Sequence, residues 1–323
     1  MKSKKKLIIL TGPTAVGKTA LSVQLAKSLN TEIISADSMQ VYKGMDIGSA
    51  KITKEEMAGI RHHLIDIVTP FEEFNVVEFQ KCAKLAMEEI YAKDKIPIIV
   101  GGTGFYIQAL LYDVDFKESV VDEEFRKQMY DYAGKYGAEA LHNKLNLVDE
   151  KAADEIPFNN VKRVIRALEF NRQTGRKISE HNEQERVKES PYDFVYFVLN
   201  DDRAALYERI EKRIDTMLEN GLLEEVMKLR ELGCNKDMVS MKGIGYKEIL
   251  DYFDGNTTYS EAIDILKRDT RHFAKRQLTW FRREKKVEFI NIKEFDYNKD
   301  ILLQYTLQRC IDVELIEADK YKD

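Results

Sequence analysis

The chain has 323 residues and a formal net charge of −5, and 44% of its residues are hydrophobic. This composition suits a soluble globular protein with one large or two smaller cores, and no apolar run is long enough for a membrane span or a signal peptide. The acidic balance argues mildly against a nucleic-acid partner, because binding to phosphate backbones depends on Lys and Arg. The three cysteines are far apart and form no CxxC pair, so we expect a reducing cytoplasm, with neither a disulfide framework nor a zinc knuckle.

Short β-rich runs alternate with helical stretches along most of the chain. Alternation of this kind predicts an α/β fold, in which a parallel sheet is flanked by helices on both faces. Stretches 203–232 and 259–284 carry apolar residues at helical spacing, and each is predicted to form one helix. The five predicted strands are 7–10, 32–35, 97–100, 194–199 and 287–292.

An interval between the third and fourth strands has no convincing strand pattern. Its helix-start and helix-stop residues predict several capped helices, so we interpret 117–190 as an all-helical insertion domain in a core domain made of 1–116 and 191–323. The boundary signals are Asp122 and Gly137 for one helix, Pro157 for the end of another, and Asn159 or Asn160 and Gly175 for a third.

The first strand runs directly into the sequence GPTAVGKT at 12–19, which opens a helical stretch. This GxxxxGK[ST] pattern, called the phosphate loop below, lets consecutive backbone N–H groups converge on phosphate oxygens. Lys18 supplies a mobile positive charge, and the Thr19 hydroxyl is placed to ligand Mg²⁺. We therefore expect a diphosphate or triphosphate ligand. The residues assigned to phosphate binding are Gly12, Thr14, Ala15, Val16, Gly17, Lys18 and Thr19.

Two further groups of residues follow predicted strands at the edge where open α/β sheets bind ligands. Asp37 follows the second strand, and it is either a general base or the N-cap of a helix. The run Gly101-Gly102-Thr103-Gly104 follows the third strand and brings backbone and a hydroxyl to the same edge, unless it is only a tight turn.

Arg209 and Arg213 lie four residues apart on one face of a predicted helix. They are able to clamp a diphosphate as bidentate donors, or to form exposed ion pairs with nearby acids, which is the commoner role. The candidate acids are Glu208, Glu211 and Asp215. The pair His62-His63 is a poor metal site, because adjacent side chains point apart and Asp66 is the only acid nearby.

Two basic stretches depart from the acidic average. The first is 161–177, where Lys162, Arg163 and Arg166 are among six cations that accompany one acid, Glu169. The second is 267–286, where Lys275, Arg276 and other cations lie opposite an apolar face. A basic face opposite an apolar one suits a helix that docks on its domain and presents charge to a polyanion, although solvated charge explains either stretch alone.

Three classes of function fit parts of this pattern. A P-loop kinase for a small metabolite explains the phosphate loop and Asp37 but needs neither basic stretch. An NTPase motor or switch needs a strand that ends in an acid for Mg²⁺, whereas the third strand ends in Gly101-Gly102. An RNA-binding module without catalysis leaves the phosphate loop unexplained.

A series of motifs now connects the whole chain to one family. In this order and over almost the full length, the chain resembles the tRNA dimethylallyltransferase family, also called tRNA isopentenylpyrophosphate transferases. The motifs are GPTAVGKT at 12–19, DSMQVYKGMDIGSAK at 37–51, HHLID at 62–66, GGT at 101–103, KRVIRALE at 162–169, GIGYKE at 243–248 and KRQLTW at 275–280. Eukaryotic members carry a C-terminal zinc finger, whereas this tail has only Cys310 and no histidine pair, so the resemblance is to the bacterial type.

The resemblance implies a P-loop NTPase-like core and transfer of a dimethylallyl group from dimethylallyl diphosphate to N6 of adenosine 37 in tRNA. It implies that residues 14–19 hold the diphosphate with Mg²⁺ and that Asp37 accepts the proton of the attacking amine. Lys18 and Thr103 complete the implied catalytic set. An adenine amine is a poor nucleophile, so a placed carboxylate, worth about 10²- to 10⁴-fold, suits this reaction.

The resemblance also assigns binding roles residue by residue. Arg213 and Arg209 match the helix whose arginine reaches the diphosphate. The implied tRNA contacts are Asp37, Ser38, Met39, Gln40, Thr103 and Arg126, to which the basic stretches add Lys162, Arg163, Arg166, Lys275 and Arg276. We expect a monomer without membrane contact whose insertion clamps the anticodon stem-loop. An adenylate prenyltransferase and a small-molecule kinase remain the alternatives.

Overall fold

The computed structural model describes residues 4–116 and 121–318. Backbone contacts divide the chain into two compact units, Met1–Leu110 with Pro191–Asp323, and Leu111–Ser190. The boundary expected at 117 falls within 117–120, outside the described residues.

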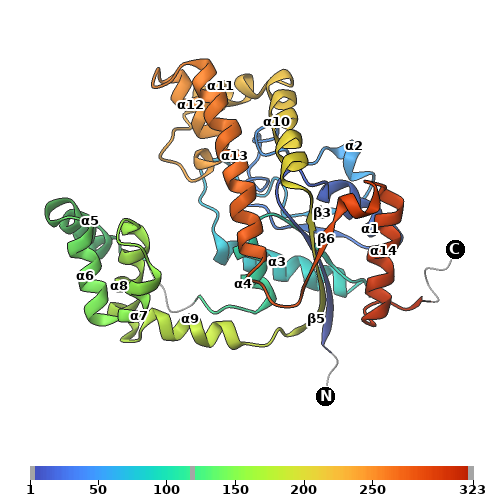
Figure 1. Ribbon diagram of the computed structural model, residues 1–323, viewed down its shortest axis with the longest axis horizontal. Helices are drawn as coiled ribbons and strands as arrows, with labels where there is room; N and C mark the ends of the chain where they lie inside the picture. Colours follow the sequence, from blue (N-terminus) through green and yellow to red (C-terminus); the bar gives the residue numbers. More distant parts are fainter. Residues whose placement is uncertain (1–3, 117–120, 319–323) are drawn as a thin grey trace. The chain divides into compact units, whose positions relative to one another are not determined.

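The first unit is built on a parallel sheet. Within the described residues, the strands form one six-stranded sheet in the order β3-β2-β4-β1-β5-β6 (Figure 1). Leu7 to Leu10 of β1 are completely buried, as expected for a strand covered on both faces. The sheet confirms the predicted α/β class. Its strands are β1 (Lys5–Thr11), β2 (Ile33–Ser35), β3 (His62–His63), β4 (Ile98–Gly101), β5 (Tyr192–Asn200) and β6 (Val287–Asn291).

The five predicted strands are all present, and β3 is an addition. It has two polar residues and pairs with β2 through Ile33 to His62 and Ile34 to His63. So short an edge strand has no apolar alternation in its sequence, and only pairing with its neighbour defines it.

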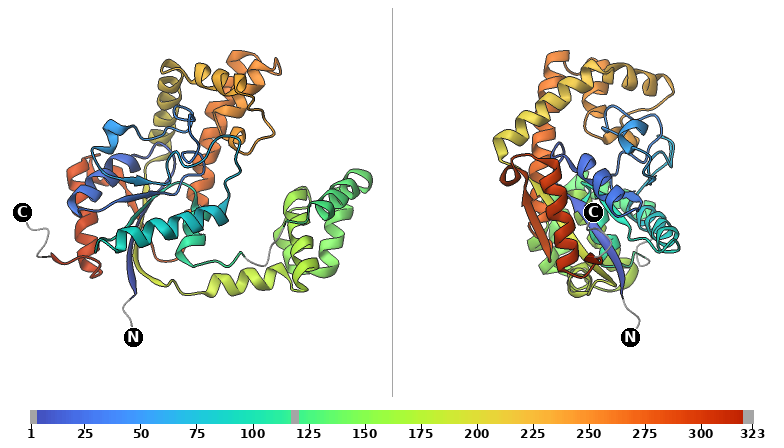
Figure 2. Two further views of the ribbon diagram at one scale, coloured as in Figure 1. Left: turned by 180° about the vertical axis from the view of Figure 1, so that it is seen from behind. Right: turned by 90° about the vertical axis from the view of Figure 1, so that its right-hand side faces the viewer.

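Helices cover both faces of this sheet. α1 and α14 pack together on one face, and α3 lies on the other (Figure 2). This placement follows from right-handed crossovers between parallel strands. The helices of this unit are α1 (Lys18–Ser28), α2 (Lys54–Met57), α3 (Val76–Tyr91), α4 (Gly104–Leu111), α10 (Arg203–Glu219), α11 (Leu222–Glu231), α12 (Tyr246–Phe253), α13 (Tyr259–Phe281) and α14 (Lys299–Asp312), with 3₁₀ turns at Ser240–Lys242 and Ile292–Phe295.

The expectation of a single helix over 203–232 is wrong. The chain breaks at Gly221, whose φ of 98° is left-handed, and α11 begins at the next residue. Glycine adopts this conformation without steric cost, and the apolar spacing continues across the break. The helix expected over 259–284 is α13, which ends at Phe281, three residues before the expected end.

The described residues of the second unit form helices and loops, with no strand. Asp122 accepts the N–H of Phe125 at the start of α5, Asn160 caps α8, and Gly175 ends α8 with a φ of 69°. These ends agree with the predicted boundaries. The stretch expected to end at Pro157 is two helices, α6 and α7, and α9 has no counterpart among the expected elements. The helices are α5 (Glu123–Tyr136), α6 (Ala138–Val148), α7 (Glu150–Glu155), α8 (Val161–Thr174) and α9 (Ile178–Val187).

The carboxylate of Asp149 ties α7 to α9 inside this unit. It is 1% exposed, and it accepts hydrogen bonds from the Ala152 N–H, the Ser179 N–H and the Ser179 hydroxyl at 3.0, 3.0 and 2.6 Å. Burial alone raises the pKa of Asp149, but the bonds from Ser179 and Ala152 outweigh it and lower the pKa. The ionised carboxylate is therefore a structural element of the unit.

No helix among the described residues is both long enough and apolar enough to cross a membrane.

Asp149→Asn should reduce the free energy of opening of the helical unit by about 1–3 kcal/mol. The substitution replaces one accepting oxygen by an N–H₂ donor, which then faces another donor. Hydrogen exchange of peptides from 138–187, measured on the full chain, reports this loss. The control is Asp154→Asn at an exposed position of α7, which should change the opening energy by less than about 0.5 kcal/mol. Equal losses in both variants contradict the assigned role.

Candidate active site

One cavity of about 770 Å³ lies at the carboxyl edge of the sheet in the first unit. The loops that follow β1, β2 and β4 line it, together with α10 and α13. Parallel strands all present their carboxyl ends to the same edge, so residues that follow different strands meet there. Of the expected site residues, those lining the cavity are Thr14, Ala15, Gly17, Lys18, Thr19, Asp37, Gln40, Arg209 and Arg213.

The phosphate loop has the backbone expected of an anion cradle. Gly17, with a φ of 99°, precedes the first residue of α1, and Ala15 is also left-handed with a φ of 64°. A Cβ on Gly12 would lie 2.4 Å from the carbonyl oxygen of Leu199, so only glycine allows this approach to β5. Val16 is buried behind the loop rather than facing the cavity.

Lys18 is held inside the loop. Its ammonium donates to the carbonyl oxygens of Gly12 at 2.9 Å and Pro13 at 2.8 Å. Burial, together with the charge of Arg213, lowers the pKa of Lys18 to about 7, and the charge of Asp37 opposes the shift. The lysine is thus placed to regain a full positive charge when an anion binds nearby.

Arg213 brings a second cation from α10 to the same loop. Its Nη1 lies 3.5 Å from the Thr14 hydroxyl oxygen. Burial lowers the pKa of Arg213 from its usual value, whereas the carboxylates of Asp37 and Glu56 act in the opposite direction. Two partly desolvated cations beside one carboxylate form a strong site for a multiply charged anion.

Asp37 follows β2 and faces this pair of cations across the cavity. Its Oδ1 accepts the N–H groups of Met39 at 2.8 Å and Gln40 at 3.3 Å. The alternative that Asp37 caps a helix is wrong, because residues 36–53, all of them described, contain no helix. The carboxylate instead closes a turn, which fixes its position beside the cavity.

A glycine run brings the end of β4 against two neighbouring segments. A Cβ on Gly101 would lie 2.2 Å from the Ala36 carbonyl oxygen, and a Cβ on Gly104 would lie 2.2 Å from the Trp280 ring. The Thr103 N–H donates to the Ala36 carbonyl at 3.2 Å, one residue before Asp37. The run is therefore more than a tight turn, since it allows close approach to β2 and to α13.

Glu225 on α11 is a residue of this region that sequence reasoning missed. Its Oε2 accepts the N–H groups of Asp46 and Ile47 at 2.8 Å each. Its Oε1 accepts the Gly48 N–H at 3.0 Å and the Tyr246 hydroxyl at 2.8 Å. The carboxylate thereby anchors the loop that leads from Gln40 to the cavity-lining residues at 49–50. No local pattern marks it, because its backbone partners at 46–48 are 177 to 179 residues away and Tyr246 is 21 residues away.

Arg209 lines the cavity but pairs with an unexpected acid. Its guanidinium lies 3.3 Å from Asp201 Oδ2 and over the Tyr297 ring. The expected partners Glu211 and Asp215 are instead bound by Arg271 and Lys267, each at 2.6 Å. The expectation of local helix ion pairs is wrong, since α13 packs beside α10 and supplies cations to its acids.

The two histidines of β3 have different surroundings, as expected for adjacent strand residues. His63 Nε2 lies 2.8 Å from the buried Glu32 carboxylate, whereas His62 lines the cavity with its Nδ1 2.9 Å from the Ile60 carbonyl oxygen. Burial lowers the pKa of His62, which favours the neutral imidazole. Among the described residues, no three His, Cys, Asp or Glu side chains are grouped to hold a metal ion.

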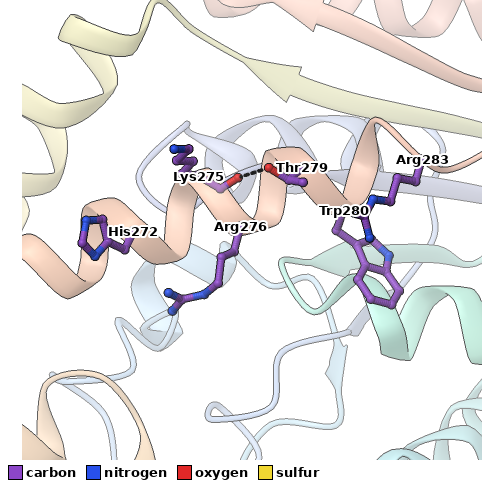
Figure 3. Close-up of a pocket in the computed structure, with 6 residues that line it drawn as sticks. All are labelled: His272, Lys275, Arg276, Thr279, Trp280 and Arg283. Atoms are coloured by element: carbon purple, nitrogen blue, oxygen red, sulfur yellow. Dashed lines mark hydrogen bonds between the residues drawn. The ribbon is translucent and has the colours of Figure 1, made fainter. Parts of the chain in front are cut away.

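A second hollow, of about 460 Å³, lies along α13. Figure 3 shows its lining side chains on successive turns of this helix, with the Thr279 hydroxyl donating to the Lys275 carbonyl at 2.9 Å. Lys275 and Arg276 are exposed here, and the Trp280 ring lies edge-on to Phe105. The surface combines cations with an aromatic ring. The lining residues are His272, Lys275, Arg276, Thr279, Trp280 and Arg283.

The remaining expected contacts lie in the helical unit. Lys162, Arg163 and Arg166 are exposed on α8. Arg126 is bound by the buried Glu169 through two hydrogen bonds, from Nε at 2.9 Å and from Nη2 at 2.7 Å. The single acid of the first basic stretch is thus already paired, and α8 presents net positive charge to solvent.

A family model described as IPP transferase matches residues 40–284, which is more than half of the chain. The tRNA dimethylallyltransferase of Lachnoclostridium phytofermentans is 57% identical over 298 residues, which cover 92% of this chain and 95% of the relative. That of Acetivibrio thermocellus is 50% identical over 303 residues, covering 93% and 97%.

Two solved structures are similar to the whole chain or most of it. The full-length tRNA isopentenylpyrophosphate transferase of Bacillus halodurans has a TM-score of 0.72 and 45% identity, covering 96% of this chain and 98% of that one. A eukaryotic dimethylallyltransferase acting on tRNA has a TM-score of 0.77 and 31% identity, covering 89% and 74%.

The pKa of Lys18 predicts how affinity for inorganic diphosphate changes with pH. Below about pH 7 the lysine is already protonated and contributes a constant affinity. Above that pH, binding must take up a proton, so affinity should fall by up to about tenfold per pH unit. Calorimetric titration from pH 6 to 9 measures the slope. In Lys18→Arg the charge persists and this part of the slope should vanish, whereas equal slopes in both proteins contradict the shifted pKa.

Proposed function

The chain belongs to the IPP transferase family, and we infer from this that it is a tRNA dimethylallyltransferase. The observation that supports this most directly is one cavity in which Lys18 and Arg213 face the carboxylate of Asp37. We propose dimethylallyl diphosphate as the donor and N6 of adenosine 37 as the acceptor. The proposed enzyme acts as a monomer in the cytoplasm.

In the proposed reaction, N6 of adenosine forms a bond to C1 of the dimethylallyl group while the bond from C1 to the diphosphate oxygen breaks. Asp37 accepts the N6 proton, so the product is a neutral secondary amine. Lys18, Arg213 and the N–H groups of the phosphate loop stabilise the charge that develops on the departing diphosphate. Gly12 and Thr14 to Gly17 shape the loop that holds it, and Arg209 lies at the rim of the same cavity.

The residues present suit a magnesium ion that is bound to the diphosphate. Thr19 is exposed in the first turn of α1 and lines the cavity, so its hydroxyl would hold the ion together with phosphate oxygens and water. When bound, Mg²⁺ supplies further charge stabilisation of the leaving group.

The acceptor side is proposed to involve Thr103 and residues 37–40. Ser38 and Met39 follow Asp37 in the same turn, and Gln40 Nε2 donates to the Ala50 carbonyl at 3.3 Å. The target base must leave the stack of the anticodon loop to reach this turn, at a cost of a few kcal/mol. Contacts to the RNA backbone would offset that cost.

We propose that those contacts come from two separate surfaces. One is α8 with Lys162, Arg163 and Arg166, together with Arg126 on α5, whose side chain remains 30% exposed while paired with Glu169. The other is the exposed face of α13 with Lys275 and Arg276. An adenylate prenyltransferase or a small-molecule kinase requires neither surface, so their presence favours the tRNA enzyme.

Transfer of radiolabel from dimethylallyl diphosphate, with Mg²⁺, tests the proposal. The acceptors are an unmodified stem-loop with A37, AMP and ATP in competition. Label on the stem-loop alone supports the tRNA enzyme, whereas label on the free nucleotides points to an adenylate prenyltransferase. In the same assay Asp37→Asn should lower the rate by about 10²- to 10⁴-fold with stem-loop affinity retained. Asp264→Asn, on the exposed face of α13, is the control, and full turnover in Asp37→Asn removes it as the base.

Neutralising α8 tests the proposed clamp. Arg163→Gln with Arg166→Gln should weaken binding of the stem-loop and reduce the slope of log affinity against log salt by about 0.7 to 0.9 per lost phosphate contact. Filter binding across a salt series measures both quantities. Lys127→Gln with Lys144→Gln removes the same charge from α5 and α6 and serves as the control. Identical salt slopes in the two double variants argue against a specific role for α8.

A further inference from the structure

Gln277 is a buried polar residue on α13 that the proposed reaction does not use. It is 6% exposed, although Lys275 and Arg276 immediately before it are exposed. Its Oε1 accepts the Thr14 N–H at 2.9 Å, and its Nε2 donates to the Gly102 carbonyl at 2.9 Å. One amide therefore joins the phosphate loop to the loop that carries Thr103.

The fit around this amide is close. A Cβ on Gly102 would lie 2.2 Å from Gln277 Nε2, so a side chain at this position would displace the amide. An amide group is the side chain that satisfies both partners, because it offers one acceptor and one donor side by side. A buried N–H or carbonyl that loses its partner is costly, so each loop is held to the amide.

The two hydrogen bonds reach the reacting groups through short connections. On one side, the Thr14 hydroxyl contacts Arg213 Nη1, so the residue anchored by Gln277 also orients a diphosphate cation. On the other side, Gly102 precedes Thr103, whose N–H donates to Ala36, the residue before Asp37. The Thr14 N–H is directed toward Gln277, which leaves its hydroxyl to face the cavity.

We propose that Gln277 is a positioning residue that sets the spacing between the diphosphate site and the acceptor site. This inference rests on the proposed function. Displacement of a leaving group requires the attacking nitrogen and the departing oxygen in line on opposite sides of one carbon. An error of about 1 Å in such an arrangement costs about 10²-fold in rate. The same helix turn carries Lys275 and Arg276 on its exposed side. A tRNA bound there would contact the helix that holds both loops.

Gln277→Met keeps the length of the side chain and removes both hydrogen bonds. We expect kcat to fall by about 10²-fold and the Kd for inorganic diphosphate to rise by about tenfold, while stem-loop affinity stays within about twofold. Gln308→Met makes the same chemical change at an exposed position of α14 and should leave all three values unchanged. A variant that loses thermal stability but keeps kcat and the diphosphate Kd per folded molecule overturns the proposal.

A double-mutant cycle separates positioning from general damage. Gly102→Ala should lower kcat in the native background, because its Cβ displaces the Gln277 amide. In the Gln277→Ala background the amide is gone, so the same substitution should have little further effect. Additive losses overturn the proposed linkage.

The two proposals fail in different ways. If the native chain transfers no label to any acceptor, the proposed function fails. Gln277 is then judged by the diphosphate Kd alone, where an unchanged value in Gln277→Met overturns its role.

Discussion

The site depends on close backbone approach at one edge of a parallel sheet. The strand order places the ends of β2, β4, β1 and β5 side by side, and glycine is required where they meet. Gly12 touches the Leu199 carbonyl and Gly101 touches the Ala36 carbonyl at distances that exclude any Cβ. These contacts bring the phosphate loop, Asp37 and the glycines at the end of β4 to one cavity.

Burial and neighbouring charges together set the pKa values of the two cations in that cavity. Lys18 and Arg213 both have lowered pKa values because burial penalises their charged forms, and the Asp37 carboxylate partly compensates. A diphosphate with its metal ion would add the missing counter-charge, so binding and the ionisation of Lys18 are linked. Binding of a diphosphate is therefore expected to be tightest when Lys18 is protonated.

Side chains from distant helices hold the loops that carry these groups. Glu225 and Tyr246 anchor the turn at 46–48, and Gln277 joins the phosphate loop to Gly102. Such residues fix the positions of the segments that line the cavity. Glu225 and Gln277 each make two or more hydrogen bonds to the loops they hold, which favours one arrangement of each loop over its alternatives.

Local sequence alone determined the elements whose causes are local. Apolar runs defined five strands, Asp122, Asn160 and Gly175 defined helix ends, and spacing defined the phosphate loop with Lys18 and Thr19. The motif series identified the family. Each of these signals lies within a few residues of the feature it predicts, so no knowledge of packing is needed.

Tertiary structure alone decided the rest. It added the edge strand β3, broke the helix at Gly221, turned Arg209 toward Asp201 and placed Gln277 between two loops. It also set the pKa of Lys18, which depends on burial and on Arg213 from α10. The partners of β3, Gln277 and Lys18 are distant in the chain, and no local pattern records a contact that forms only when the sheet assembles. Asp201 is only eight residues before Arg209, but it precedes α10 and lies outside the i, i+4 spacing of a helical ion pair. At Gly221 the glycine was visible, but the apolar spacing on either side continued through it.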